Sequence, residues 1–218
     1  MRKLLDAINV IDVESTCWDT KIPPDKEISE IIEIGICSLD VKSLEIKNKK
    51  SVLLQPKEST ISPFCTKLTT ITPEMVNNCP VFEQVCFDLR QEYLLEERVW
   101  ASYGDYDRNM FQKQCSRLHI QYPFGSRHIN IKTLIALTMA WDTEVGMDEA
   151  LNRLELPLVG THHRAGDDAA NIAQILSFVL SIPKERELTP KEVTGLSSRG
   201  WLPKNGGTFR VIIARKEK

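Results

Sequence analysis

The sequence contains no apolar run that approaches the roughly 18 residues of a transmembrane helix. Near the N-terminus, Asp6 and Asn9 interrupt the apolar stretch too early for a signal peptide, so none is expected. Hydrophobic residues make up 42% and charged residues 27% of the 218 positions, as is ordinary for a globular protein. We therefore expect no membrane partner, and one domain with a full core followed by a short extension.

The sequence also lacks a recognisable cysteine pattern. Its six cysteines include no CxxC pair and no dense framework, which argues against structural zinc and against disulfides. Reduced thiols in the core or near the surface fit this spacing better, and they predict a cytoplasmic protein. The cysteines are Cys17, Cys37, Cys65, Cys79, Cys86 and Cys115.

An excess of positive charge, which is common in nucleic-acid-binding proteins, is missing too, because the formal net charge is −2. The charges are nevertheless segregated along the chain. Residues 181–218 hold nine of the 28 Lys/Arg and four of the 30 Asp/Glu, a balance of +5, which leaves −7 for the remainder. We divide the chain into a domain of residues 1–182 and a basic extension of residues 183–218. The extension could hold a polyanion beside a metal site, or it could simply be solvated.

No internal repeat is present, and strand patterns alternate with helix patterns. Residues 7–15 form an apolar, β-branched run that is typical of a buried central strand. Residues 30–40 and 49–56 predict two more strands in an antiparallel meander, and residues 98–104 predict a fourth strand. Near the C-terminus, the glycine-rich residues 199–216 predict a turn followed by a strand or hairpin.

Helices are expected between and after these strands. Thr72 and Pro73 predict an N-cap and a first helical residue, and Pro80 predicts the start of a second helix. Further helix patterns cover residues 105–118, 131–141 and 147–156, and a long helix starts within residues 161–176. This order predicts an α/β domain with a mixed sheet.

Two acidic residues, Asp12 and Glu14, lie in the first predicted strand. Positions i and i+2 of a strand face the same side, so both carboxylates emerge together. Their repulsion and loss of hydration require compensation, which divalent cations with oxygen ligands provide well. The alternative is that both acids lie at an exposed strand end and are simply solvated.

Helical spacing separates the aspartates of the segment SYGDYD. From Asp107, the positions on the same helical face, Met110, Phe111, Cys115 and Leu118, are all apolar. From Asp105, the corresponding positions are polar. Asp107 therefore begins the buried face and is predicted to point towards the sheet, whereas Asp105 caps the helix or faces water.

The same test separates the two aspartates of THHRAGDDAANIAQIL, residues 161–176. Asp168 precedes Ile172 and Ile175 on an apolar face, while Asp167 precedes a largely polar line and should look outward or cap the helix. The loop residue five positions before Asp168 is His163. A loop histidine near a metal site suits a general base that deprotonates water. His162 is expected to be a surface residue without a role.

These patterns together place four carboxylates and one imidazole at a single site: Asp12, Glu14, Asp107, Asp168 and His163. Oxygen-rich ligands favour Mg²⁺ or Mn²⁺ over zinc. Two such ions about 4 Å apart would hold the attacking and leaving oxygens of a phosphodiester. Their charge would offset the acids, so an acidic domain remains compatible with nucleic-acid binding.

The segments IDVESTCW, SYGDYD and HRAGDD resemble the three motifs of the DEDDh 3′–5′ exonucleases, which have an RNase H-like fold. EIIEIG, FCTKLTTIT and HRAGDDAANIA further resemble the branch that contains the histone-mRNA and small-RNA 3′ exonucleases and the bacterial KapD-like proteins. The resemblance covers roughly residues 6–182. It implies an RNase H-like mixed five-stranded sheet flanked by helices, with Asp12, Glu14, Asp107 and Asp168 as ligands of two Mg²⁺ or Mn²⁺ ions and His163 as the base.

The resemblance also implies substrate contacts. Leu68 and Ile71 lie in a segment similar to the loop that meets the terminal nucleotide, and Cys17 and Trp18 follow the first motif. Trp18 could stack on a base or simply pack. Glu33 matches a common acidic position, for which a structural role is equally plausible.

We expect removal of nucleotides from the 3′ end of single-stranded nucleic acid, with release of nucleoside 5′-monophosphates and RNA favoured over DNA. The alternatives are a DNA exonuclease of the proofreading or repair type, a catalytically idle nucleic-acid-binding module, and a phosphodiesterase for small nucleotides. No residue decides between RNA and DNA.

Overall fold

The computed structural model describes residues 3–20, 24, 27–182, 184–187 and 210–213. The chain forms two compact units, Met1–Ser177 and Phe178–Lys218. Within the described residues, no helix is both long and apolar enough to cross a membrane.

The first unit contains a five-stranded mixed sheet in the order β3-β2-β1-β4-β5. Strand β1 (Ala7–Ser15) pairs antiparallel with β2 (Ile31–Asp40), which pairs antiparallel with β3 (Ile46–Leu53). On its other side β1 pairs parallel with β4 (Val99–Ser102), and β5 (His128–Asn130) continues the parallel half. The predicted mixed α/β sheet is confirmed.

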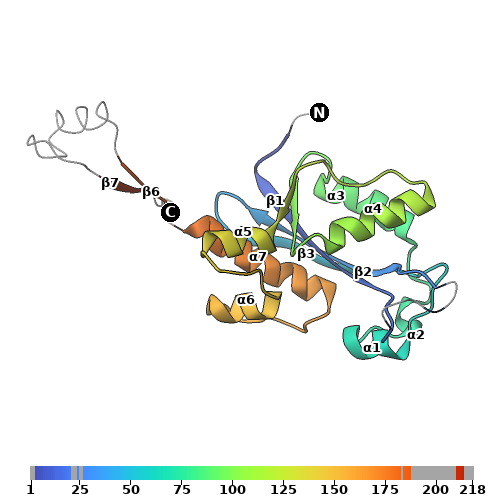
Figure 1. The fold of residues 1–218 in the computed structure, drawn as a ribbon. Helices are drawn as coiled ribbons and strands as arrows, with labels where there is room; N and C mark the ends of the chain where they lie inside the picture. Colours follow the sequence, from blue (N-terminus) through green and yellow to red (C-terminus); the bar gives the residue numbers. More distant parts are fainter. Residues whose placement is uncertain (1–2, 21–23, 25–26, 183, 188–209, 214–218) are drawn as a thin grey trace, which may run out of the picture. The chain divides into compact units, whose positions relative to one another are not determined.

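Helices cover both faces of this sheet (Figure 1). On one side lie α3 (Phe82–Tyr93) and α4 (Tyr106–Leu118). On the other lie α5 (Ile131–Thr138), α6 (Met147–Arg153) and α7 (Ala165–Ser181), of which α7 extends into the second unit. Because both faces of the central strands are covered, β1 and β2 are apolar along most of their length.

The alternation of β1 divides its side chains between the two faces. Ile11 and Val13 join a core with α3 and α4, in which Phe82, Phe111 and Trp100 are almost fully buried. The intervening Asp12 and Glu14 therefore face the side of the sheet on which α7 lies. Asp12 and Glu14 are thus kept out of the apolar core that β1 forms with α3 and α4.

Two short helices stand at the end of the sheet in Figure 1. Helix α1 (Pro63–Thr69) starts at Ser62, whose side-chain oxygen accepts from the backbone N–H of Cys65. Helix α2 (Pro73–Val76) has Thr72 at its N-cap position and proline at its first turn, as predicted. Behind both helices, Ile32, Ile61, Cys65, Ile71 and Val76 form a second, smaller core.

Most predicted elements are present, and two strands were not foreseen. Strand β5 is only three residues long, and β6 (Lys184–Glu187) begins three positions after the last residue of α7. In the second unit β6 pairs antiparallel with β7 (Arg210–Ile213), which confirms a strand within residues 199–216. The predicted turn of that segment and the other basic positions of residues 183–218 lie outside the described residues.

Candidate active site

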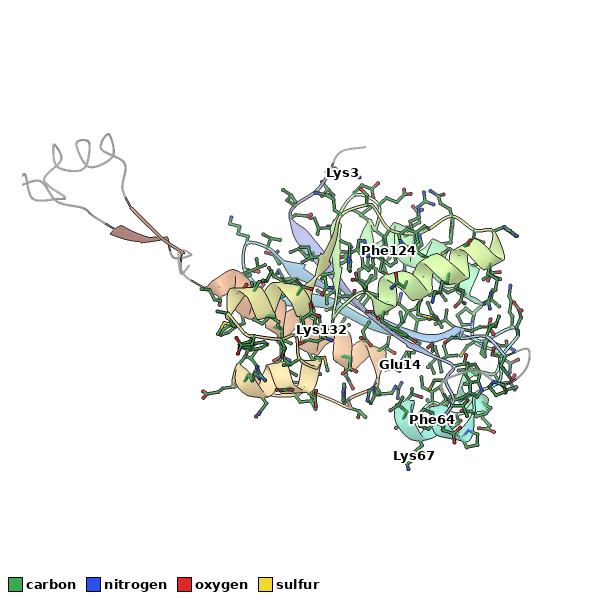
Figure 2. The ribbon with its side chains drawn as sticks, viewed as in Figure 1. Lys3, Glu14, Phe64, Lys67, Phe124 and Lys132 are labelled. Atoms are coloured by element: carbon green, nitrogen blue, oxygen red, sulfur yellow. The ribbon has the colours of Figure 1, made fainter. Side chains whose placement is uncertain are left out.

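The carboxylates of β1 lie on the part of that strand that extends beyond its pairing with β4. The pairing of β1 with β4 reaches only Val10, opposite Ala101, whereas β1 continues to Ser15. Ligand oxygens of Asp12, Glu14 and Asp168 all lie within 4.8 Å of one another. The prediction that the two acids of β1 emerge on one face is confirmed, and Figure 2 shows Glu14 between the helices of the two sheet faces.

Helix α4 supplies a fourth carboxylate, beside the part of β1 that β4 does not pair with. Asp107, in the first turn of α4, is buried, and its Oδ1 accepts a hydrogen bond of 3.0 Å from the backbone N–H of Val13. This bond replaces the strand pairing that β1 lacks there. Asp105 occupies the N-cap position without a side-chain capping bond and pairs instead with Arg108 at 3.0 Å. Helical spacing therefore distinguished the two aspartates correctly.

The N-terminus of α7 is held against the sheet by close backbone contact and by a buried ion pair. A Cβ atom on Gly35 of β2 would come within 1.8 Å of the carbonyl oxygen of Ala165, so only glycine allows this approach. Glu33, which is fully buried, accepts from Arg164 Nη2 at 2.9 Å and from the backbone N–H of Ala165 at 2.9 Å. Glu33 therefore has a structural role, in which it fixes the start of α7.

This anchoring directs the two aspartates of α7 to different sides. Asp168 is buried and faces Asp12 and Glu14. Asp167 lies away from them and accepts from Lys49 Nζ at 2.7 Å and from the backbone N–H of Thr161 at 2.9 Å. The predicted division between the two residues is confirmed in the structure.

The histidines before α7 are arranged differently from the prediction. The backbone N–H of His163, rather than its ring, donates to Asp168 Oδ2 at 2.9 Å, and His163 Nδ1 lies 3.9 Å from Glu14 Oε1. His162 was expected on the open surface, and the structure instead places it on the cavity wall beside Asp168. Its Nδ1 lies 3.1 Å from Asp168 Oδ2, and the two imidazoles stack with centroids 4.0 Å apart.

The local cause of this arrangement is the backbone of His163, whose φ of 64° is in the left-handed region. Such conformations are uncommon for residues other than glycine. The turn brings the rings of His162 and His163 together over Asp168. Nothing in the helical periodicity of α7 indicates this turn, because it lies in the loop before the helix.

A cavity of about 340 Å³ opens in front of these groups. Cys17 and Leu68 line it, as expected of substrate contacts, together with Tyr103, Tyr106 and Met147, which were not foreseen. Tyr106 directly precedes Asp107, and its hydroxyl lies 2.6 Å from that of Ser15, so its place in the motif was the available signal. The remaining lining residues are Asp12, Val13, Glu14, Ser15, Asp107, His162, His163, Asp168 and Ile172.

Two of the expected substrate contacts are not part of this cavity wall. Ile71 is fully buried in the smaller core and offers no surface to a ligand. Trp18 is partly buried and lies outside the residues that line the cavity. The structure therefore brings Cys17 and Leu68 to the site, but not Ile71.

Burial and mutual repulsion govern the protonation of the carboxylates. Burial, reinforced by the charges of Asp168, Glu33 and Asp107, raises the pKa of Glu14 to about 8. Burial also raises the pKa of Asp107 to about 7, against the lowering effect of the Val13 N–H. The pKa of Asp12 is raised well above its ordinary value by burial and by the neighbouring carboxylates.

These raised pKa values describe a site with too much negative charge for its surroundings. A divalent cation would restore balance, and the donor atoms fit one, because carboxylate oxygens of Asp12, Glu14 and Asp168 converge within 4.8 Å. All three donors are hard oxygens, which suit Mg²⁺ or Mn²⁺. Asp107, whose second oxygen is not used by Val13, faces the same cavity.

A mixed sheet covered by helices, with carboxylates from β1, α4 and α7 converging at one end, defines an RNase H-like nuclease fold. A solved structure, "Crystallographic structure of the nuclease domain of 3'hExo, a DEDDh family member, bound to rAMP", matches with a TM-score of 0.72 and 27% identity, over 83% of this chain and 94% of that one. Residues 9–176 match the family described as Exonuclease. The chain belongs to that family, and its predicted likeness to the DEDDh branch is confirmed.

Among curated proteins, the human protein "ERI1 exoribonuclease 3" is 32% identical over 177 residues, which are 77% of this chain and 51% of that protein. The Bacillus subtilis protein "Probable 3'-5' exonuclease KapD" is 26% identical and matches 80% of this chain and 84% of its own length. The chain thus spans about half the length of the human relative and most of the bacterial one.

Proposed function

We propose that this protein is a two-metal 3′–5′ exonuclease that hydrolyses single-stranded nucleic acid, RNA in preference to DNA. The observation that carries the proposal is the convergence of Asp12, Glu14 and Asp168 within 4.8 Å, with buried Asp107 beside them. An idle binding module would have no need for this costly cluster of like charges. Exoribonuclease names among the similar proteins favour RNA.

In this mechanism, Asp12, Glu14, Asp107 and Asp168 would hold two Mg²⁺ or Mn²⁺ ions, and the bound ions would supply charge that stabilises the attacking and leaving oxygens. His163 accepts a proton from the attacking water. Burial, followed by the neighbouring His162, lowers the pKa of His163, so its imidazole is neutral and able to accept at neutral pH.

The bond changes are those of phosphodiester hydrolysis at the 3′ end. The water oxygen bonds to phosphorus, and the bond from phosphorus to the 3′ oxygen of the preceding nucleotide breaks. That oxygen takes up a proton, and a nucleoside 5′-monophosphate leaves. Cys17 and Leu68 at the cavity wall would contact this terminal nucleotide.

The size of the cavity suits a single terminal nucleotide. About 340 Å³ falls in the range of pockets that bind one small molecule. All six cysteines are free, which agrees with a reducing, cytoplasmic compartment for the reaction.

The test is a gel time course with matched 5′-labelled single-stranded RNA and DNA in Mg²⁺, Mn²⁺ or EDTA. We expect a metal-dependent ladder that shortens from the 3′ end, is faster on RNA, and disappears in Asp12→Ala. The absence of a ladder on both polymers in both metals would overturn the proposal, and a faster DNA ladder would overturn the RNA preference.

A further inference from the structure

The two adjacent histidines before α7 form, with Asp168, a group of donor atoms whose chemistry differs from that of the carboxylate site. One donor atom each of His162, His163 and Asp168 lies within 4.8 Å of the other two. Nδ1 of His162 is 3.1 Å from Oδ2 of Asp168, and the two imidazoles stack with their centroids 4.0 Å apart. Two imidazoles and one carboxylate are therefore close enough to bind a single ion.

The carboxylate of this group is fixed, whereas the two rings are accessible. Asp168 is buried, and its Oδ2 accepts from the backbone N–H of His163 at 2.9 Å. The side chains of His162 and His163 are 36% and 40% exposed, so an ion can reach them from solvent. The torsion that turns a histidine ring is broad, so small rotations can direct both nitrogens towards an ion beside Asp168.

The donor set of this group suits transition ions better than Mg²⁺. Mg²⁺ prefers oxygen ligands in octahedral geometry, whereas imidazole is a common ligand of zinc. Two histidines and one carboxylate, with a further position open, are a known donor set for Zn²⁺. Oε1 of Glu14 lies 3.9 Å from Nδ1 of His163 and offers an additional oxygen at the edge of the group.

This group overlaps with the carboxylate site because both contain Asp168. Nδ1 of His162 lies 3.2 Å from Oδ1 and 3.1 Å from Oδ2 of Asp168, so an ion on the histidines would draw on the same carboxylate. It would also occupy a ring nitrogen of His163, which the proposed mechanism uses to accept a proton. Binding at the histidines should therefore oppose catalysis.

We propose that His162, His163 and Asp168 form a binding site for a divalent transition ion, with Zn²⁺ favoured, and that its occupation reversibly inhibits the nuclease. The binding site depends only on these side chains, whereas the inhibition rests on the proposed exonuclease function. Sites with nitrogen and oxygen donors bind Zn²⁺ more tightly than Mn²⁺. Zinc should consequently inhibit at concentrations well below those at which Mg²⁺ or Mn²⁺ supports activity.

The experiment measures zinc binding directly in the full-length, metal-free protein by titration calorimetry with ZnCl₂. Co²⁺ serves as a second probe, because nitrogen ligands and a low coordination number strengthen its visible absorption. The test variant is His162→Asn, whose amide can still donate to Asp168 but which lacks the imidazole. The matched control is His119→Asn, which changes an exposed histidine at the end of α4. Thermal melting verifies that both variants are folded.

His162→Asn should weaken zinc binding by at least about ten-fold, because loss of an outer partner of a metal ligand already costs about that much. The absorption of bound Co²⁺ should fall in this variant, and its affinity for Mg²⁺ should change far less than its affinity for zinc. His119→Asn should match the wild type in each measurement.

In the nuclease assay, the inhibition of each protein is expressed relative to its own rate without zinc. The zinc concentration for half inhibition should rise in His162→Asn by a factor similar to its loss of zinc affinity. In the wild type this concentration should also rise with added Mg²⁺, because the two ions compete for Asp168.

Equal zinc affinity in His162→Asn and the wild type would overturn the site and assign zinc to the carboxylates alone. Zinc that binds through His162 but leaves cleavage unchanged would overturn the inhibition. A wild type that binds zinc through His162 and cleaves no substrate in Mg²⁺ or Mn²⁺ would support the binding site and overturn the proposed exonuclease function. The two failures are thus distinguishable.

Discussion

At the scale of single residues, Asp168 is the carboxylate with the most defined surroundings. Its Oδ2 accepts from the His163 backbone and lies 3.1 Å from His162 Nδ1, so two consecutive residues orient it. The ring of His163 is thereby left free to face Glu14 and the cavity. The backbone of His163 thus orients Asp168, and its side chain remains available for the proposed proton transfer.

This division predicts unequal effects for the two histidines. His163→Ala should lower kcat by about 10²- to 10⁴-fold, because the general base is lost while its backbone N–H still orients Asp168. His162→Ala should have a much smaller effect, of about ten-fold or less, since Asp168 retains its backbone bond. Single-turnover rates at saturating Mg²⁺ measure both. A larger loss of kcat in His162→Ala than in His163→Ala would indicate that His162, not His163, is the general base.

Repulsion among the clustered carboxylates should lower the stability of the metal-free protein. Asp12→Asn removes one of several like charges in buried surroundings, so the metal-free protein should melt at a higher temperature than the wild type near pH 8. The same variant should lose its activity and most of its thermal shift on addition of Mg²⁺. Melting in EDTA and in MgCl₂ tests both effects. A lower melting temperature in EDTA would contradict the repulsion argument.

The orientation of the four carboxylates could be predicted because each follows from a regular repeat. Asp12 and Glu14 share a face by the two-residue repeat of a strand, and helical spacing selected Asp107 and Asp168. The position of His162 could not be predicted in this way. It depends on the positive φ of His163 in a short loop, which no periodic pattern encodes.

At the scale of elements, the contact between β2 and the start of α7 sets the position of Asp168 in the site. Glu33 on β2 binds both Arg164 and the Ala165 backbone, and Gly35 allows α7 to approach β2 closely. Asp168 lies one turn further along the helix. A shift of the start of α7 away from β2 would separate Asp168 from Asp12 and Glu14.

We therefore expect Glu33→Ala to lower the free energy of unfolding by about 3 kcal/mol, because it leaves Arg164 and a buried backbone N–H without their acceptor. Urea unfolding measures the change. The matched control is Glu92→Ala, which removes an acid from the exposed pair with Lys50 and should cost less than about 1 kcal/mol. Equal losses in the two variants would show that Glu33 does not anchor α7.

The length and burial of each element explain whether it could be predicted from the sequence. The buried runs of β1 and β2 and the amphipathic pattern of α4 carry strong signals, since they pack on the core along their whole length. Strand β5 has three partly buried residues, too few to show any period. Its place in the sheet is decided by pairing with β4, a contact between distant segments.

At the scale of the whole molecule, the order of the strands assembles the site. Because β1 is central and parallel to β4, the C-terminal end of β1 lies beside the loop that leads from β4 into α4. Helix α7 then returns across β2, so carboxylates separated by more than 150 positions meet at one end of the sheet. The antiparallel pair β2 and β3 leaves the other side of β1 fully bonded.

The convergence of these charges makes the stability of the metal-free protein dependent on pH. The pKa of Glu14 is raised from 4.5 to about 8, and that of Asp107 from 3.8 to about 7, mainly by burial. Between about pH 4 and pH 8 the folded state therefore binds more protons than the unfolded chain. Stability consequently falls as pH rises through this window, instead of rising as it does for paired carboxylates.

Mg²⁺ should reverse this trend, because it binds the ionised carboxylates. We expect the melting temperature in EDTA to be lower near pH 8 than near pH 5.5, and the rise caused by saturating MgCl₂ to be larger near pH 8. Thermal melting in buffers of equal ionic strength measures both. The double variant Glu14→Gln, Asp107→Asn should show a flatter pH profile in EDTA. A rise equal at both pH values would mean that proton release is not coupled to metal binding, and that the raised pKa values do not reflect the charge a metal would offset.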